Sequence, residues 1–297
     1  MIESKLTLDA LNAAPPGEFA AALANVFEHS PWIAAAAANA RPFASLAELR
    51  DAMIAVIDQA SPERRLGLIR AHPDLANRTQ RAAGLTAEST AEQDGAGLDR
   101  LSDAEFALFE QSNGAYREKF GFPFVLCVRR HTRDSILDTF ARRLKNQPAQ
   151  EEREAIGEIG RIATLRLAEL VESAVPLPVN GQLSTHVLDT HAGQPAAGVA
   201  LELIELSRHG VSRLITKTAT NADGRVDRPL IEGRPVPIGA YELRFHMGDY
   251  FARRGVALNE PPFLEIVPVR FGVSEPEAHL HIPLLVTPWS YTTYRGS

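Results

Sequence analysis

The residues with the clearest capacity for chemistry lie near the end of the chain. His279 and His281 are two residues apart in a run that alternates like a β-strand, so their side chains share one face. His186 stands in a second strand-like run, and Arg225 ends a turn that starts at Thr220. Two imidazoles and a guanidinium can polarise a carbonyl, direct a water molecule and hold an electron-rich heterocycle. The pattern therefore indicates an acid–base site.

The tail that follows Pro288 is expected to join this site. It supplies an aromatic side chain at Tyr294, a fixed cation at Arg295, a glycine and a hydroxyl at Ser297. A chain end is usually the least constrained part of a domain. In this chain, the end is preceded by β-branched and aromatic residues, which suit an ordered segment that lines a pocket.

Two alternatives to the acid–base site stay open at this point. The spacing of His279 and His281 is also that of zinc ligands, although no third and fourth ligand is obvious near them. A single histidine on a strand is commonly a structural residue with a satisfied hydrogen bond. The same residues therefore also fit a zinc-dependent cyclic amidohydrolase, or histidines with a purely structural role.

A second candidate site lies in the first half of the chain. Pro73 disfavours helix at His72, which places this imidazole at the end of the helix begun at Ser61. If Ser89 caps the next helix, Glu92 and Gln93 fall in its first turn, where free N–H groups favour anions. Such a cluster can hold a carboxylate substrate and move a proton. The simpler alternative is a capping box and a helix-end hydrogen bond with no catalytic role.

The elements that position the second candidate site, around His72, are helices. Up to about Ser173 the apolar residues recur at helical spacing, and hydroxyl residues followed three places later by glutamate mark helix starts. These signals predict helices that begin at Ser45, at Ser61 with Pro62 in the first turn, at Ser89 and at Ser102, with further helices over 136–144 and 151–173.

The periodicity then changes from helical to alternating. Residues 175–180 form a proline-punctuated linker between two domains, 1–174 and 181–297. Beyond the linker, short alternating runs separated by turn signals favour a β-sandwich. The predicted strands are 183–188, 199–206, 214–220, 241–247, 264–271 and 279–286. The expected fold class is multidomain, with an all-α N-terminal domain followed by an all-β sandwich.

Composition excludes several classes of protein. The 297 residues carry a net charge of −6, with 45% hydrophobic and 23% charged residues, which is ordinary for a soluble globular protein and offers no footprint for nucleic acid. The single cysteine, Cys127, lies in an apolar run and reads as a buried small side chain. No apolar stretch approaches the ~20 residues that span a bilayer, and no secretion signal is visible. We expect a cytoplasmic enzyme with no membrane partner.

The C-terminal motifs resemble the 5-hydroxyisourate hydrolases, a transthyretin-related family. The matching segments are Leu183–Asp189, Thr220–Arg225, His279–Pro288 and Tyr294–Ser297, in the family's order. The resemblance implies a transthyretin-like sandwich that forms a homotetramer, with active sites at the dimer–dimer interface and metal-free hydrolysis of 5-hydroxyisourate. By motif position it implies a site of His186, Arg225, His281, Tyr294 and Ser297. It leaves His279 as the weaker histidine, and Trp289 replaces a frequent tyrosine.

The N-terminal motifs resemble the decarboxylases of 2-oxo-4-hydroxy-4-carboxy-5-ureidoimidazoline (OHCU). The matching segments are Arg41–Phe43, Ala71–Leu75, Ser89–Gln93, Phe120–Val125 and Leu165–Leu167. The resemblance implies an all-helical domain without a cofactor that forms (S)-allantoin. It implies an acid–base pair, His72 and Glu92, and substrate-binding groups at Ser89, Gln93, Arg166 and the Phe124–Val125 backbone.

Together the two resemblances imply one chain that catalyses consecutive steps of urate degradation. The rival from another functional class is a binding protein, because fold does not fix function and transthyretin itself carries a hormone. The histidines, Arg225 and the Tyr294–Ser297 tail discriminate between the two, since a carrier has no use for an acid–base set.

Overall fold

The computed structural model describes residues 6–77 and 85–296. The chain divides into two compact units, Met1–Arg129 with Ile136–Val179, and Arg130–Ser135 with Asn180–Ser297. The division between Val179 and Asn180 falls inside the expected linker. Segment 130–135 groups with the second unit, where Thr132 N donates to Ile238 O at 3.0 Å.

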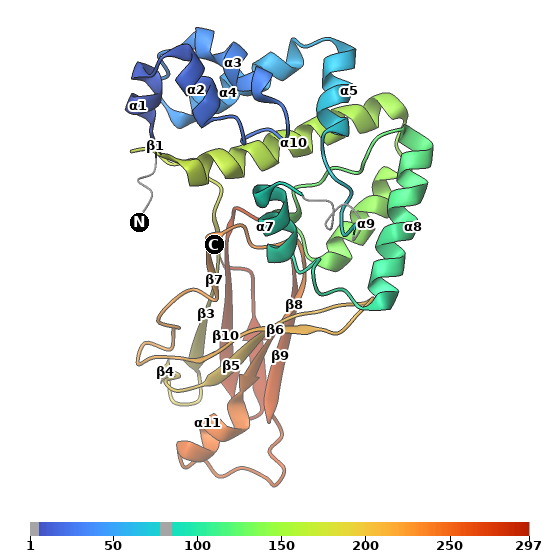
Figure 1. Ribbon diagram of the computed structural model, residues 1–297. Coiled ribbons are helices and arrows are strands. Elements are labelled where there is room, and N and C mark those ends of the chain that lie inside the picture. The colour runs from blue at the N-terminus through green and yellow to red at the C-terminus, as the bar shows by residue number, and fades with distance from the viewer. Residues whose placement is uncertain (1–5, 78–84, 297) are drawn as a thin grey trace. The chain divides into compact units, whose positions relative to one another are not determined.

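The first unit is helical, as the sequence predicts (Figure 1). Among its described residues, two short strands, β1 (Leu6–Thr7) and β2 (Val171–Glu172), pair in parallel near its ends. Its α-helices are α1 (Leu8–Ala13), α2 (Pro16–Ala22), α3 (Pro31–Ala37), α4 (Leu46–Asp58), α5 (Pro62–Arg70), α7 (Ala87–Gly95), α8 (Asp103–Phe120), α9 (Arg133–Arg143) and α10 (Pro148–Leu170), with 3-10 turns at Ala38–Ala40 and Val128–Arg130.

Helix starts follow the capping chemistry in most places. Ser61 caps α5 with Pro62 in the first turn, and Ser102 and Glu105 form a complete capping box at α8. The expectation for Ser89 is wrong. The N-cap of α7 is Thr86, whose hydroxyl accepts from Ser89 N at 3.2 Å. Helix α7 therefore starts one turn earlier than predicted, and Glu92 and Gln93 are not first-turn residues.

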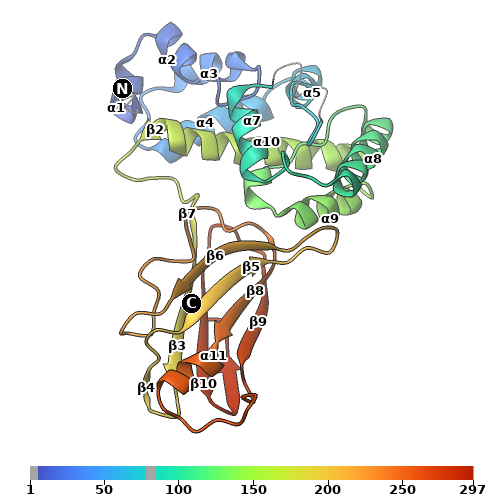
Figure 2. The ribbon, with the colours of Figure 1, turned by 60° about the horizontal axis from the view of Figure 1, so that its bottom comes forward.

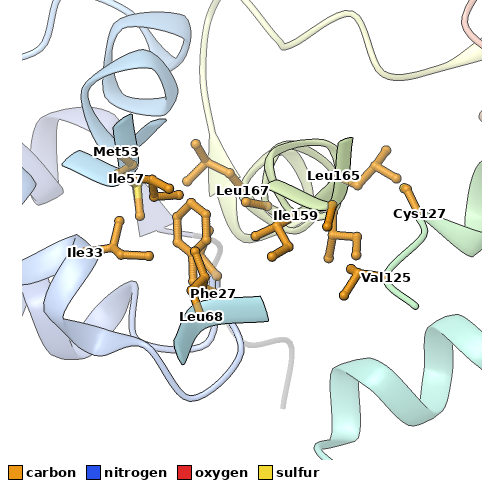
Figure 3. Packing of buried hydrophobic residues seen from close by; sticks show 14 of the residues in the cluster. Phe27, Ile33, Met53, Ile57, Leu68, Val125, Cys127, Ile159, Leu165 and Leu167 are labelled. Carbon is orange, nitrogen blue, oxygen red and sulfur yellow. The ribbon is translucent and has the colours of Figure 1, made fainter. Parts of the chain in front are cut away.

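Helix α10 supplies the centre of the helical core. Figure 3 shows Ile159, Leu165 and Leu167 of α10 between Ile33, Met53 and Ile57 on one side and Val125 and Cys127 on the other. Burying each such aliphatic side chain contributes about 1.5–3 kcal/mol. The segment around Val125 carries pocket residues, so the same packing that stabilises the unit also positions one side of the candidate site.

The second unit is a sandwich of two sheets (Figure 2). One sheet has the order β11-β10-β3-β4, with β7 also paired to β3, and the other has the order β6-β5-β8-β9. The inner faces enclose one apolar core that includes Leu183, Leu243 and Leu284. The strands are β3 (Gly181–Asp189), β4 (Gln194–Pro195), β5 (Ala200–Glu205), β6 (Arg213–Ala219), β7 (Ile231–Arg234), β8 (Gly239–His246), β9 (Ile266–Val273), β10 (His279–Thr287) and β11 (Ser290–Thr293), with helix α11 (Met247–Arg253) after β8.

Every strand predicted from alternation is present, with ends shifted by a few residues. The sequence missed the short strands β4, β7 and β11 and the helix α11. Helix α11 follows β8 directly, and its apolar residues Tyr250 and Phe251 are buried in the sandwich core. The last described residue, Gly296, bonds to His281 of β10, and Ser297, which the sequence predicts as a pocket residue, lies outside the described residues.

Candidate functional site

The helical unit has a pocket that gathers every site residue predicted for it. The empty volume is about 330 Å³, including solvent at the mouth. Its walls come from the end of α5, from α7, from the loop before the turn at Val128 and from α10. The lining residues are His72, Pro73, Leu75, Ser89, Glu92, Gln93, Phe124, Val125, Leu126, Val128, Ile162 and Arg166.

His72 is held as a neutral imidazole. The ring is buried, and its Nδ1 donates to Leu68 O at 3.0 Å, because a carbonyl can only accept. Nδ1 therefore carries the hydrogen, and Nε2 has a free lone pair with no partner in the described chain. Burial lowers the pKa of His72 to about 4, against the opposing effects of the Leu68 hydrogen bond and the negative charge of Glu28.

Arg166 connects the acidic groups of the pocket. Its Nε and Nη2 bind both carboxylate oxygens of Glu92, at 2.8 and 2.9 Å. Nη1 binds Glu28 Oε2 at 3.0 Å and Asn25 O at 3.2 Å, and Nη2 also donates to Ser89 Oγ at 3.3 Å. Burial alone would lower the pKa of Arg166, but these carboxylates raise it, so the guanidinium stays charged.

Ser89 does not act as a helix cap. Its hydroxyl donates to Glu28 Oε2 at 3.0 Å and accepts from Arg166. Glu28 lies in the turn between α2 and α3, and nothing in the sequence marks it as a site residue. Its contacts with α7 and α10 span 61 and 138 residues of sequence, so no local pattern could have found it.

Gln93 has one end of its amide fixed and the other end free. Its Oε1 accepts from Ala76 N at 3.0 Å, which settles the orientation of the amide. Ala76 has a left-handed φ of 57°, an unusual conformation for alanine. The NH₂ of Gln93 has no partner in the described chain and can donate to a ligand.

The loop over Phe124 and Val125 is clamped from behind by buried polar groups. Arg143 Nη1 donates to Val125 O at 2.7 Å, and Arg143 itself pairs with Glu151, both being fully buried. Glu158 Oε2 accepts from Cys127 N at 2.9 Å. No hydrogen bond within the described residues uses the backbone N–H of Phe124 or Val125, so both remain available to a ligand.

In the β unit, register brings the second set of predicted residues onto one face. Parallel pairing of β3 with β10 sets His281 beside Ser184 and Pro283 beside His186. Isolated bridges add Arg225 opposite His186 and Gly296 opposite His281. Strand neighbours of these residues, such as Leu183 and Ile282, point into the core, so the histidines lie on the outer face.

Ser184 links the two histidines of β10. Its Oγ lies 2.8 Å from His279 Nε2 and 2.9 Å from His281 Nδ1. His279, the histidine given less weight, is therefore coupled to His281 through a residue that the sequence analysis missed. The register of two strands 97 residues apart creates this contact, and alternation within one strand does not reveal it.

Burial, and after it the charge of Arg225, lowers the pKa of both site histidines. Burial lowers the pKa of His186, and the charge of Arg225 lowers it further. The same two causes, burial first, lower the pKa of His281. His186 Nε2 is buried and has no hydrogen-bond partner among the residues that the structure describes. An imidazole nitrogen that carries a lone pair can act as a base when substrate and water reach it.

The tail closes over this face. Gly296 N donates to His281 O at 2.9 Å, which anchors the last described residues beside the histidine. Tyr294 is 59% exposed and forms no hydrogen bond in the described chain. The exposed rings of Trp289 and Tyr291 lie on the same hairpin of β10 and edge strand β11.

Across residues 6–77 and 85–296, no three His, Cys, Asp or Glu side chains gather in a way that could hold a metal ion. In the same ranges, no helix has the length and apolar character needed to cross a bilayer.

Comparison with known proteins finds two family matches in the one chain. The model of the OHCU decarboxylase family matches residues 12–168, and that of the HIUase/transthyretin family matches residues 183–296. A crystal structure of (S)-allantoin synthase is similar over 98% of this chain and 100% of its own, with 35% identity and a TM-score of 0.53.

Curated relatives match the two parts separately. A 5-hydroxyisourate hydrolase of Halalkalibacterium halodurans is 51% identical over 119 residues, which is 40% of this chain and 100% of that protein. An OHCU decarboxylase of Haloferax volcanii is 43% identical over 169 residues, which is 57% of this chain and 98% of that protein. Each part of this chain is thus similar to a whole protein with its own name.

Proposed function

The chain belongs to the OHCU decarboxylase family over residues 12–168 and to the HIUase/transthyretin family over residues 183–296, and from this premise we propose how its two sites act. It is a bifunctional enzyme of urate degradation. The β unit hydrolyses 5-hydroxyisourate to OHCU, and the helical unit decarboxylates OHCU to (S)-allantoin. The observation that carries this conclusion is the presence of both families in one chain that a solved (S)-allantoin synthase matches along almost its whole length.

In the hydrolase site, neutral imidazoles activate water. We assign His186 and His281 as the pair of which one removes a proton from water and the other protonates the opening ring. Arg225 orients the substrate ring and stabilises negative charge on the attacked carbonyl oxygen. Tyr294 and Ser297 line the pocket. The lowered pKa values of both histidines support this assignment, because a general base must be unprotonated at neutral pH.

In the decarboxylase pocket, His72 and Glu92 form the acid–base pair. The substrate's own ring C=N accepts the electron pair that CO₂ leaves behind, so the proposal needs no cofactor. His72 Nε2 and the Glu92 carboxylate face the pocket, and the Gln93 NH₂ and the N–H groups of Phe124 and Val125 are free to hold the ring and ureido oxygens. Ser89 and Arg166 also line the pocket and complete the set, with Arg166 orienting the Glu92 carboxylate through two hydrogen bonds.

The assembly is proposed to be a tetramer built through the β unit. The histidine face is only partly covered in one chain, and the aromatic side chains beside it, Trp289, Tyr291 and Tyr294, are exposed. A second copy that covers this face would complete the pocket. Sedimentation of the purified protein tests the proposal, and a monomer at micromolar concentration contradicts it.

A cytoplasmic location is likewise proposed, to be tested by fractionation.

The decisive experiment feeds freshly made 5-hydroxyisourate to the full chain. Absorbance follows the decay of the substrate, and circular dichroism follows the optical activity of the product. We expect fast decay and a single enantiomer. His281→Asn should slow hydrolysis by about 100-fold or more, the scale of lost acid–base catalysis.

His72→Ala is the matched variant for the other site. It should abolish stereoselective formation of allantoin and leave ring hydrolysis intact. If both activities fell together in a folded variant, the assignment of one activity to each unit would be wrong.

For the zinc alternative, one zinc per chain and chelator-sensitive turnover would contradict the metal-free mechanism.

A further inference from the structure

Glu28 is a buried carboxylate that binds Ser89 and Arg166, two residues that line the decarboxylase pocket, and it has no assigned role. Its side chain is 2% exposed, and it accepts hydrogen bonds from Thr86 Oγ1 at 2.7 Å, Ser89 Oγ at 3.0 Å and Arg166 Nη1 at 3.0 Å. Burial raises its pKa, but the Thr86 hydroxyl and the charge of Arg166 outweigh burial and lower it. Glu28 is therefore ionised in the folded protein.

The next residue supports a built geometry at Glu28. His29 has a left-handed φ of 46°, a conformation that costs energy for a residue with a side chain. This backbone places the Glu28 carboxylate under α7 and α10 while the ring of His29 stays 69% exposed. The turn thus places the carboxylate of Glu28 in the interior, although the neighbouring position, His29, faces solvent.

Arg166 has no donor left for a substrate. A guanidinium has five N–H groups, and the five hydrogen bonds of Arg166 go to Glu92 twice, to Glu28, to Asn25 O and to Ser89 Oγ. Its positive charge is shared by two carboxylates. In this arrangement Arg166 orders the acidic groups of the pocket, and it does not offer an open cation to the substrate carboxylate.

The charges around His72 therefore leave the pocket negative. Glu28, Arg166 and the exposed His29 act on the His72 ring, and Glu92 is bound to Arg166. Arg129 also faces Glu92, but it has its own carboxylate partner, Glu169. With His72 neutral, two carboxylates and one guanidinium give one excess negative charge. A substrate that is itself a carboxylate would add a second.

We propose that Glu28 is a positioning residue of the decarboxylase pocket, whose charge makes the pocket bind one proton together with the anionic substrate and holds that proton on His72. The proposal rests on the proposed function, since it requires a carboxylate substrate. His72 is the acceptor because its Nε2 lone pair is free, whereas both carboxylates are held by Arg166.

The chemistry of decarboxylation requires this proton. When the bond to the carboxylate breaks, CO₂ leaves as a neutral molecule and the electron pair passes into the ring, whose C=N nitrogen takes up a proton. The hydroxyl proton then leaves as another proton arrives at the ring carbon. The balance is one proton consumed for each CO₂ released. A proton loaded onto His72 with the substrate supplies that balance inside the pocket.

The test measures kcat for (S)-allantoin formation as a function of pH in Glu28→Gln, Glu28→Asp and the unchanged protein. An excess of the full-length His72→Ala variant supplies OHCU, so that ring hydrolysis is not limiting. We expect the alkaline limb of kcat to move to lower pH by about one unit in Glu28→Gln, the scale of one lost charge interaction. Above the limb its activity is then about tenfold lower, without an increase in KM. Glu28→Asp keeps the charge and should keep the limb.

A matched control is Glu105→Gln, which alters a buried carboxylate at the start of α8, outside the pocket. It should leave the position of the limb unchanged. A Glu28→Gln profile with the limb in place and a raised KM would show a structural role and overturn the proposal. If no Glu28 variant folds, a kcat of the unchanged protein that is constant from pH 6 to 9 overturns it too. Failure of the proposed function looks different, because the unchanged protein would then form no enantiomeric excess at any pH.

Discussion

A serine hydroxyl can donate one hydrogen bond, yet two imidazole nitrogens face that of Ser184. One of them must then donate to the serine oxygen while the other accepts from the hydroxyl. If His281 Nδ1 accepts, its Nε2 carries hydrogen and His279 Nε2 is the donor. The reverse arrangement frees His281 Nε2 to act as a base. The tautomers of the two histidines are therefore linked at the level of single atoms.

Removal of the Ser184 hydroxyl should slow ring hydrolysis. We expect Ser184→Ala to lower kcat for 5-hydroxyisourate by about tenfold, because His281 loses the group that fixes its tautomer. Ser184→Thr retains a hydroxyl and should recover most of the rate. Decarboxylation by the same variants is the internal control. Equal hydrolysis rates for the alanine and unchanged proteins would show that the contact is incidental.

The charge of Arg225 should set the acid side of the hydrolase pH profile. His186 and His281 have lowered pKa values, caused first by burial and then by Arg225, so both stay neutral in the pH range where a histidine ordinarily titrates and become protonated only at lower pH. In Arg225→Gln the pKa values rise, and the acid limb of kcat/KM should move to higher pH. The position of the limb, measured separately from the loss of rate, checks this. A limb that stays in place would mean that burial alone depresses the histidines.

At the scale of elements, local chemistry predicted most helix starts but misplaced α7. Ser102 and Glu105 satisfy each other at α8, as their spacing indicates. Ser89 and Glu92 have the same spacing, but Thr86 caps the helix and leaves both side chains to Arg166. A capping motif indicates which local hydrogen bonds can form. Here Arg166 of α10, distant in sequence, binds both side chains instead.

Positions within strands were predictable, whereas contacts between strands were not. Alternation placed His279 and His281 on one face, and the structure agrees. The approach of Ser184 depends on the parallel register of β3 and β10, which follows from the fold as a whole. Glu28 was missed for a related reason, because only the packing of its turn against α7 and α10 brings it beside the pocket residues Ser89 and Arg166. The sequence therefore predicts those pocket residues that belong to recognisable motifs. It does not predict Ser184 and Glu28, which bind them through contacts between distant segments.

The buried pair behind the Phe124–Val125 loop should be essential to the helical unit. Arg143 and Glu151 are both 0% exposed, and Asn146 and Tyr116 also bind Glu151. Removing one partner of such a pair costs about 3–5 kcal/mol, because the other charge is left uncompensated. We expect Arg143→Ala to lower the free energy of unfolding of the helical unit by that amount, measured by denaturant titration.

A double variant separates charge from packing at this pair. Arg143→Met with Glu151→Leu removes both charges and keeps apolar volume, so most of the lost stability should return. Decarboxylation should stay reduced in the double variant, because Val125 O still lacks its donor. If the double variant unfolded as easily as Arg143→Ala, the instability would come from lost packing and not from the buried charge.

At the scale of the whole molecule, the two activities should work when they lie on different chains. The His72→Ala and His281→Asn variants each keep one site. A mixture of the two should therefore convert 5-hydroxyisourate to (S)-allantoin at about the rate expected from the number of intact sites, because nothing requires OHCU to stay on the chain that made it. Circular dichroism of the product measures the outcome. A racemic product from the mixture would instead point to direct transfer between sites of one molecule.

The bare backbone of Gly296 has a consequence for how the hydrolase can vary. A methyl group there would lie 2.9 Å from Cδ2 of the His281 ring, closer than real carbon atoms approach, and the ring is tethered by Ser184. In a library of randomised tails, we expect chains with a side chain at this position to fold and still decarboxylate, yet to fail at opening the purine-derived ring. Only glycine at position 296 leaves the His281 ring enough space to keep its position and bind a small molecule.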